Sequence, residues 1–136
     1  MELETLCIHG GKVDTDKSGA ISTPIYQTAT YAHPALGQST GYVYTRDTNP
    51  TRDALEAAMA KLEGGSAALA FASGMAAATA LMEMFSPGDH IVASDDLYGG
   101  SWRLFHRISM KNGLSFDWAD TSDPEKTEAL IRPETK

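Results

Sequence analysis

The chain contains little cysteine and little positive charge, and each shortage excludes a class of protein. Cys7 is the only cysteine in 136 residues, so no internal disulfide can form and a small secreted disulfide scaffold is excluded. The sequence has 11 Lys and Arg residues against 18 Asp and Glu residues, a formal net charge of −7. Nucleic-acid-binding proteins and proteins held on anionic membranes need clustered Lys and Arg, so the charge argues against both classes.

Long apolar runs are missing as well. No run approaches the roughly 18 apolar residues that span a bilayer, and the N-terminal Met-Glu-Leu-Glu lacks the basic and apolar regions of a signal peptide. We therefore expect a cytoplasmic protein. Its composition, 42% hydrophobic and 21% charged, is typical of a soluble globular protein, and its length is enough for about one domain.

Several chemical signatures are absent from the sequence. The four histidines show no metal-ligand spacing with cysteine or carboxylates, so we expect no metal site. The glycine patterns of dinucleotide-binding and P-loop proteins are missing, and so is the G-x-S-x-G elbow of serine hydrolases.

Residues 1–50 differ from the rest of the chain. Gly and Pro occur too often there for a long helix, yet the Tyr, Ile and Val content is high for a disordered tail. We predict an extended arm that packs on something else, such as another subunit.

Residues 51–136 alternate between helical and strand patterns, which predicts an α/β domain with a parallel sheet and flanking helices. We expect helices at residues 52–63 (with Thr51 as N-cap), 75–85, 99–111 and 123–131, a turn at 86–89, and strands at residues 67–72, 90–93 and 114–118. Residues 132–136 resemble a turn that leads into a further strand. Three strands make a thin sheet, so either a partner supplies an edge strand or the sequence is a fragment.

The first candidate site is the segment 71–77, where a strand is expected to end and a helix to begin. The first amides of a helix have no intrahelical partner and carry partial positive charge, so they bind anions readily. Small residues at Ser73 and Gly74 would let a phosphate approach the backbone closely. A tight strand-to-helix connection explains the same residues without a ligand, and spacing alone does not separate the two.

The second candidate site is the segment 42–51. In an extended chain Tyr44 and Arg46 point to the same face and would present a hydroxyl and a guanidinium to one anion. An exposed arm with an ordinary surface arginine is the alternative.

The third candidate site is the segment 95–103, which follows a predicted strand, where open α/β sheets bind their ligands. The ring of Tyr98 could stack on a planar cofactor or carry a proton. Arg103, about one helical turn further on, could meet a carboxylate. A helix-capping loop with a packed aromatic residue is the alternative.

Short motifs spread along the chain, taken together and in this order, resemble those of one enzyme family. They are Pro24–Thr30, Tyr44-Thr45-Arg46 running into Asn49-Pro50-Thr51, Leu62-Glu63-Gly64-Gly65, Ser73-Gly74-Met75 and Asp96-Leu97-Tyr98-Gly99-Gly100. The chain is similar to the Cys/Met metabolism family of pyridoxal-phosphate (PLP)-dependent enzymes, which includes cystathionine γ-synthases, cystathionine γ- and β-lyases and methionine γ-lyases. The resemblance covers essentially the whole chain.

The resemblance implies a fold, an activity and partners. The fold is the N-terminal part of the large domain of a fold type I PLP-dependent transferase: an incomplete PLP-binding α/β domain at 51–136, preceded by an arm at 1–50 that contributes to a neighbouring subunit's site. The activity is trans-sulfuration, with C–S bonds made or broken by β- or γ-elimination or γ-replacement on cystathionine, homocysteine or activated homoserine. The intact protein would be a homodimer or tetramer.

The resemblance also implies which residues would hold the cofactor. Ser73, Gly74 and Met75 would bind the PLP phosphate from within one subunit. Tyr44 and Arg46 match the Tyr-x-Arg pair that reaches the same phosphate from the neighbouring subunit.

Tyr98 matches the tyrosine that stacks on the pyridine ring, assists proton transfer and contacts the substrate. The pattern Tyr98-Gly-Gly-x-x-Arg103 is closer to the cystathionine γ-synthase and γ-lyase branch, where this arginine contacts the distal part of the substrate. Val43 departs from the acidic residue that many γ-synthases carry before the Tyr-x-Arg tyrosine, and Asp47 is a second variable site.

The lysine that forms the family's Schiff base with PLP lies in a Ser-x-Thr-Lys-like context, and no lysine of this sequence does. We therefore expect a truncated N-terminal fragment that is inactive alone. Two alternatives remain open: a non-catalytic interaction module that docks on full-length subunits, and a phosphate-binding α/β module unrelated to PLP.

Overall fold

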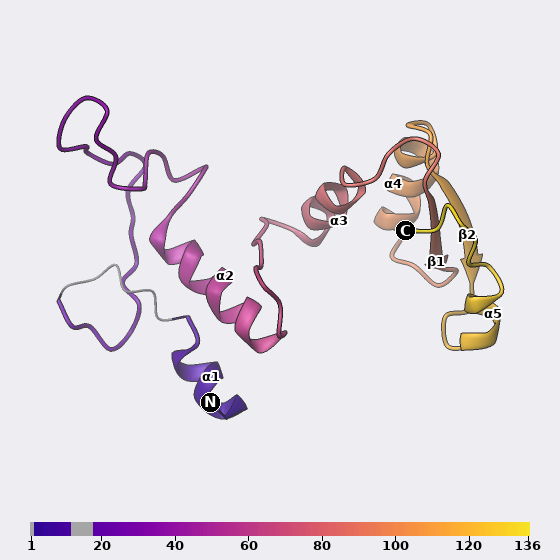
Figure 1. The fold of residues 1–136 in the computed structure, drawn as a ribbon, viewed down its shortest axis with the longest axis horizontal. Helices are drawn as coiled ribbons and strands as arrows, with labels where there is room; N and C mark the ends of the chain where they lie inside the picture. The colour runs from indigo at the N-terminus through magenta and orange to yellow at the C-terminus, as the bar shows by residue number, and fades with distance from the viewer. Residues whose placement is uncertain (1, 12–17) are drawn as a thin grey trace. The chain divides into compact units, whose positions relative to one another are not determined.

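The computed structural model describes residues 2–11 and 18–136, and the chain forms two compact units, Met1–Ala70 and Phe71–Lys136 (Figure 1). Each unit has its own internal contacts. The predicted division into an arm at 1–50 and a domain at 51–136 stays a prediction. No helix of the described residues has the length and apolarity to cross a bilayer.

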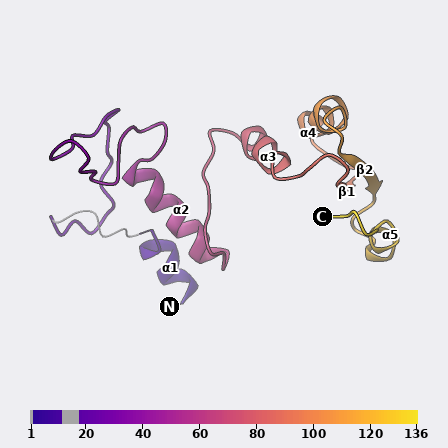
Figure 2. The ribbon, with the colours of Figure 1, turned by 45° about the horizontal axis from the view of Figure 1, so that its top comes forward.

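The first unit is built on two helices, α1 (Leu3–His9) and α2 (Pro50–Leu62), which lie side by side in both ribbon views (Figures 1 and 2). Glycine allows the end of α1 to approach α2 closely, because a Cβ added at Gly11 would lie 2.5 Å from the carbonyl oxygen of Ala54. Lys61 Nζ donates to the carbonyl oxygen of Gly10 at 2.7 Å. The sequence patterns did not predict α1.

Helix α2 confirms the helix predicted at 52–63 but begins earlier than expected. The predicted N-cap, Thr51, is wrong: Asn49 is the N-cap, and its side-chain oxygen accepts a hydrogen bond from the Thr51 amide at 2.8 Å. Pro50 occupies the first helical position, where its missing N–H costs nothing and its fixed φ favours the helix.

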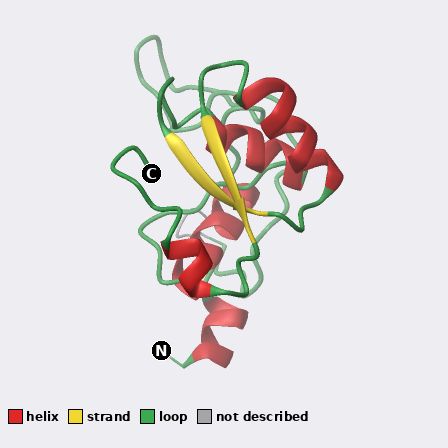
Figure 3. Cartoon of the chain, turned by 90° about the vertical axis from the view of Figure 1, so that its right-hand side faces the viewer, coloured by secondary structure: helices red, strands yellow, loops and turns green. Residues whose placement is uncertain are grey.

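The second unit contains a parallel pair of strands, β1 (His90–Ser94) and β2 (Ser115–Ala119), drawn in yellow in Figure 3. Their register runs from His90 opposite Ser115 to Ser94 opposite Ala119. The parallel sheet predicted from the alternating pattern is therefore confirmed, together with the strands expected at 90–93 and 114–118.

The strand predicted at 67–72 is wrong, because this segment is neither helix nor strand. It consists mostly of alanine, which has low β-propensity, and a short apolar run does not by itself distinguish a strand from other buried segments. The Ala70 amide donates to the Glu56 carboxylate at 2.8 Å instead of to a neighbouring strand.

The helices of the second unit are shorter than the sequence pattern suggested. They are α3 (Gly74–Met82), α4 (Gly99–Leu104), the π-helix η1 (Phe105–Ser109) and α5 (Pro124–Glu128), the last capped by the Asp123 carboxylate. The turn expected at 86–89 is confirmed: the Asp89 amide donates to the carbonyl oxygen of Ser86 at 3.0 Å, and Gly88 has a φ of 97°.

The helix predicted at 99–111 changes to a π-helix after its first six residues. The Met110 amide donates to the carbonyl oxygen of Phe105, five residues earlier, at 2.9 Å. The π-turn carries aromatic rings over the sheet: Phe105 stacks on Phe116 at 5.0 Å and His106 on Trp118 at 4.7 Å between ring centroids. Since Phe116 and Trp118 are two residues apart on β2, α4 and η1 cover one face of the sheet.

The predicted turn at the end of the chain is confirmed and leads to the free edge of β1. The Thr135 amide donates to the carbonyl oxygen of Arg132 at 2.9 Å, and Thr135 forms a parallel bridge with His90. In the described residues the sheet thus has two strands, β1 and β2, and the segment 134–136, joined to β1 by a single bridge, adds a short third strand at its edge.

One hydrogen bond in the first unit gives a pH-dependent prediction. The Tyr42 hydroxyl donates to Asp53 Oδ2 at 2.7 Å. Burial, followed by the hydrogen bond and charge of Asp53, raises the pKa of Tyr42 to about 12. The folded chain therefore keeps this proton more tightly than the unfolded chain does. The associated stability is present below pH ~10 and is lost as the pH rises from ~10 to ~12.

We predict that tyrosinate absorbance will resolve one tyrosine with a pKa near 12, and that Tyr42→Phe will remove it. Asp53→Asn should move this titration downward only in part, because burial remains. Titration of Tyr42 at the ordinary tyrosine value in the unchanged chain would contradict the assignment.

Candidate functional site

The start of helix α3 presents free backbone amides to solvent. Ser73 is the N-cap, with an extended backbone (φ −158°, ψ 157°), and its hydroxyl accepts a hydrogen bond from the Ala76 amide at 3.1 Å. Gly74 and Met75 are the first helical residues, so their amides have no intrahelical partner. A Cβ added at Gly74 would meet no atom of the described residues within 4 Å. The backbone is therefore accessible from the side where Gly74 lacks a side chain.

The start of helix α4 packs against this same turn. A Cβ added at Gly100 would collide with Tyr98 Cε1 and lie 2.9 Å from Met75 Sδ. Ser101 Oγ lies 3.9 Å from the same sulfur atom. Glycine at position 100 thus lets the beginnings of α3 and α4 meet and lets the Tyr98 ring lie over the backbone of α4.

Tyr98 and Arg103 both border the start of α4. The side chain of Tyr98 is 72% exposed, so its ring is available to a ligand. Arg103 Nη1 lies 3.8 Å from the position of a Cβ at Gly99, so the guanidinium turns back toward the first residue of the helix. A tyrosine hydroxyl, an aromatic face and one positive charge are available there.

Tyr44 and Arg46 lie together in the first unit. Arg46 Cζ is 4.9 Å from the centroid of the Tyr44 ring, a cation–π distance. Both residues line an open hollow on the surface, together with Tyr26, Gln27, Thr28, Ala29 and Thr45. The predicted alternation onto one face is thus realised as direct contact between the two side chains.

The segment that carries this pair is held by antiparallel contacts and by one buried amide side chain. Thr30 and Tyr44 form an antiparallel bridge. Asn49, only 6% exposed, donates to the carbonyl oxygen of Tyr26 and to Thr45 Oγ1, both at 3.1 Å. Asn49 thus joins the start of α2 to both segments that line the hollow.

The structure brings Ser73, Gly74, Met75 and Tyr98 into one region of the second unit and places Arg103 beside it. The pair Tyr44 and Arg46 belongs to the first unit. The sequence motifs contain Asn49 and Gly100 but do not indicate what either residue contacts in the fold. For Asn49, an Asn directly before Pro at a helix start was a usable signal. The need for glycine at position 100 comes from the Tyr98 ring and is visible only in three dimensions.

The α3 start fits the phosphate of PLP by its chemistry. A phosphate needs several N–H donors on an unobstructed backbone and favours the positive end of a helix dipole. The open side of Gly74, the unpaired first amides of α3 and the small cap Ser73 meet these requirements. An aromatic ring at Tyr98, in the adjoining turn, suits a planar heterocycle next to the phosphate.

Comparison with known proteins identifies relatives along the whole chain. The family described as "Cys/Met metabolism PLP-dependent enzyme" matches residues 4–136. Cystathionine gamma-lyase of Bacillus subtilis (strain 168) is 51% identical over 136 residues, which is 100% of this chain and 36% of that protein. Cystathionine beta-lyase of Lactococcus lactis subsp. cremoris is 48% identical over 135 residues, 98% of this chain and 35% of that protein.

A solved structure matches as well. The crystal structure of cystathionine gamma-lyase from Lactobacillus plantarum complexed with L-serine has a TM-score of 0.87 and 46% identity, over 100% of this chain and 35% of that chain. The chain therefore spans about a third of the length of the relatives it matches.

The contact between Gly100 and Tyr98 gives a prediction with a matched control at the preceding residue, Gly99. In Gly100→Ala the added methyl would collide with the Tyr98 ring, and we expect the exposed ring to swing outward while the fold is retained. In Gly99→Ala the nearest atom is the flexible end of Arg103 at 3.8 Å, so the ring should stay in place.

The ring proton resonances of Tyr98 measure this difference. A large shift in Gly100→Ala with a small shift in Gly99→Ala is the expected result. Equal shifts in the two variants would mean that Tyr98 does not lie over Gly100.

Proposed function

The chain belongs to the Cys/Met metabolism family of PLP-dependent enzymes, and we propose that it supplies the phosphate and ring contacts of the PLP site in a trans-sulfuration enzyme. The reaction would make or break a C–S bond at the β- or γ-carbon of a sulfur amino acid or an activated homoserine. The observation that carries this proposal is the meeting of two helix starts, one with open amides at Gly74 and one with the exposed ring of Tyr98.

In this proposal the start of α3 binds the phosphate. The Gly74 and Met75 amides donate to phosphate oxygens, and the hydroxyl of Ser73 lies at the same turn. The side chain of Ser73 already accepts the Ala76 amide, so its proton remains available to a phosphate oxygen.

Tyr44 and Arg46 would complete the phosphate site from a neighbouring subunit of a homo-oligomer. The guanidinium of Arg46 offers paired donors to phosphate oxygens, and its contact with Tyr44 holds the two side chains together. Tyr44 and Arg46 belong to the first unit, whereas the α3 start belongs to the second.

Tyr98 would orient the cofactor by stacking on its ring and would hold or move a proton at its hydroxyl. Arg103 would bind a substrate carboxylate beside the start of α4. PLP supplies the electron sink that this chemistry needs when it is bound. Since no lysine of the 136 residues lies in a Ser-x-Thr-Lys context, we expect no turnover from these residues alone.

We favour γ-carbon chemistry on the pattern formed by Tyr98, Gly99, Gly100 and Arg103. A γ-lyase and a β-lyase are nearly equally similar to the chain, at 51% and 48% identity, and Val43 departs from the γ-synthase pattern, so the preference for γ-carbon chemistry rests on this pattern of four residues.

Gly74→Pro tests the phosphate contact directly. Proline at the first helical position removes one amide donor and suits a helix start, and Ser73 already has the extended backbone that a residue before proline prefers. Loss of a hydrogen bond to a charged group should weaken PLP binding about tenfold or more. Gly74→Ala keeps the amide and serves as the control, with binding expected to fall less.

The measurement is the change in amide resonances of residues 73–77 during titration with PLP, compared with pyridoxal, which lacks the phosphate. We expect these resonances to respond to PLP and to inorganic phosphate but not to pyridoxal. A response to pyridoxal of the same size would place the phosphate elsewhere.

Mixing two defective chains tests whether the site is shared between subunits. Arg46→Gln and Gly74→Pro should each weaken PLP binding when present alone. If the residues come from different subunits of a symmetric dimer, random mixing should leave about a quarter of the sites with neither substitution. Binding that is not recovered by mixing, in chains shown to exchange subunits, would assign both residues to one subunit.

A further inference from the structure

A histidine that the proposed cofactor site does not use is completely buried at the start of β1. His90 is 0% exposed. In the parallel register its neighbour on β2 is Ser115, so His90 lies on the face of the sheet that also carries Asp117, opposite the aromatic face. Burying an imidazole is costly unless its ring nitrogens find partners.

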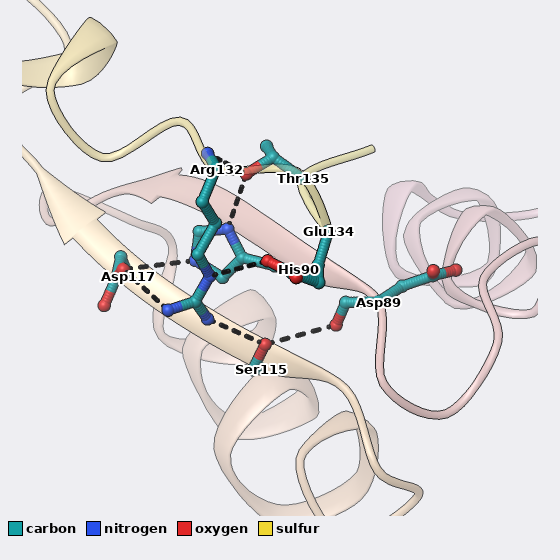
Figure 4. Close-up of polar contacts among 7 residues, drawn as sticks. All are labelled: Asp89, His90, Ser115, Asp117, Arg132, Glu134 and Thr135. Carbon is teal, nitrogen blue, oxygen red and sulfur yellow. Dashed lines mark hydrogen bonds and ion pairs between the residues drawn. The ribbon is translucent and has the colours of Figure 1, made fainter.

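The closest partner of the ring comes from the end of the chain. His90 Nδ1 lies 2.8 Å from Thr135 Oγ1, with the ring between Thr135 and Asp117 (Figure 4). Thr135 Oγ1 already accepts the Arg132 amide at 2.9 Å, and the described residues offer its own proton no acceptor except Nδ1. This arrangement favours donation from the threonine hydroxyl to Nδ1, which would put the ring proton on Nε2.

The contact on the other side of the ring agrees with this tautomer. Nε2 lies 3.2 Å from Asp117 Oδ2, and a carboxylate oxygen at that distance favours an N–H over a lone pair. Nε2 is buried and makes no hydrogen bond to any described residue, so this contact is an electrostatic one only. The bond to Thr135 is thus the better formed of the two ring contacts.

Arg132 closes the network over the same face. Its Nη2 donates to Ser115 Oγ at 3.1 Å, and its Nη1 lies 3.8 Å from Asp117 Oδ2 (Figure 4). Both side chains of the ion pair are nearly half exposed, so the pair contributes little by itself. The partly buried bond between the fully buried His90 and Thr135 is the contact that distinguishes one alignment from another.

The alignment in question is the register of the third strand against β1. The His90 amide donates to the carbonyl oxygen of Glu134 at 2.9 Å, and the Lys136 amide donates to the carbonyl oxygen of His90 at 3.0 Å. Backbone bonds of this kind are equally available to a shifted strand. A shift of one residue would bring Glu134 or Lys136 to the ring in place of Thr135 and bury a charge beside it.

We propose that His90 fixes the register of the third strand by accepting the hydroxyl proton of Thr135. His90 is a positioning residue for the segment 132–136, and the buried imidazole disfavours the one-residue shifts that would place Glu134 or Lys136 at its Nδ1. The assignment does not depend on cofactor binding, because His90 lies at the opposite end of β1 from the loop that carries Tyr98.

Two substitutions at Thr135 test the proposal in the full chain. Thr135→Val keeps the shape and removes the hydroxyl, while Thr135→Ser keeps the hydroxyl and removes the methyl. Hydrogen exchange is measured at the amides of His90 and Lys136, which report the third strand, and at those of Ser115 and Asp95, which bond to the carbonyl oxygens of Asp89 and Ala119 and report the rest of the sheet.

We expect Thr135→Val to lower protection at His90 and Lys136 about fivefold or more, the effect of one lost hydrogen bond, and to leave Ser115 and Asp95 unchanged. Thr135→Ser should retain protection within about twofold. Unchanged protection in Thr135→Val, or an equal loss in Thr135→Ser, would overturn the proposal, as would the absence of protection at both amides in the unchanged chain.

The tautomer provides a second readout that a merely structural contact would not predict. Nitrogen–proton correlation spectra of the imidazole should show the His90 proton on Nε2, with Nδ1 as a hydrogen-bond acceptor. A proton found on Nδ1 alone would reverse the direction of the bond to Thr135 and refute the mechanism.

Discussion

The parallel pairing of β1 and β2 is the constraint on which the second unit depends. The register places Phe116 and Trp118 under the helical segment α4–η1 and so fixes that segment against one face of the sheet. Once α4 is fixed, its first turn meets the first turn of α3 through the contact of Gly100 with Met75. The candidate phosphate site is therefore built by packing that begins on the far side of the helix, at the aromatic rings of β2.

The first unit has its own organising residue, Asn49. Its side chain caps α2 and also donates to the carbonyl oxygen of Tyr26 and to the hydroxyl of Thr45. Thr51 adds a second link, because its hydroxyl accepts the Tyr26 amide at 2.9 Å. The motif Asn49-Pro50-Thr51 thus serves folding in three ways: it starts a helix, aligns two extended segments and supports the contact between Tyr44 and Arg46.

Much of the second unit could be predicted from sequence, because its signals are local. The strands at 90 and 114 stood out as short apolar runs between turns, and Ser73 followed by glycine marked a helix start. The family could be predicted because separate weak motifs occurred in one order, and the match to residues 4–136 confirms it.

The errors have a common physical origin. Alanine-rich residues 67–72 satisfy a hydrophobicity pattern but lack the β-branched side chains that favour a strand. The π-turn at 105–109 is accompanied by ring stacking between residues distant in sequence. The network around His90 could not be predicted for the same reason: its members lie on β1, β2 and the end of the chain, and each is ordinary by itself.

The two short connections at 86–89 and 110–114 have a consequence for how this sequence can vary. The Gly88 amide donates to the carbonyl oxygen of Gly113 at 2.8 Å, and a Cβ on Gly113 would lie 2.9 Å from that of Pro87. Since β2 alternates aromatic and polar residues, gaining or losing one residue in the connection 110–114 would exchange the aromatic and the polar face of the strand. Relatives that share this unit should therefore keep the length of the connection and the glycine at position 113, while substitutions at its other positions should be tolerated better than insertions or deletions.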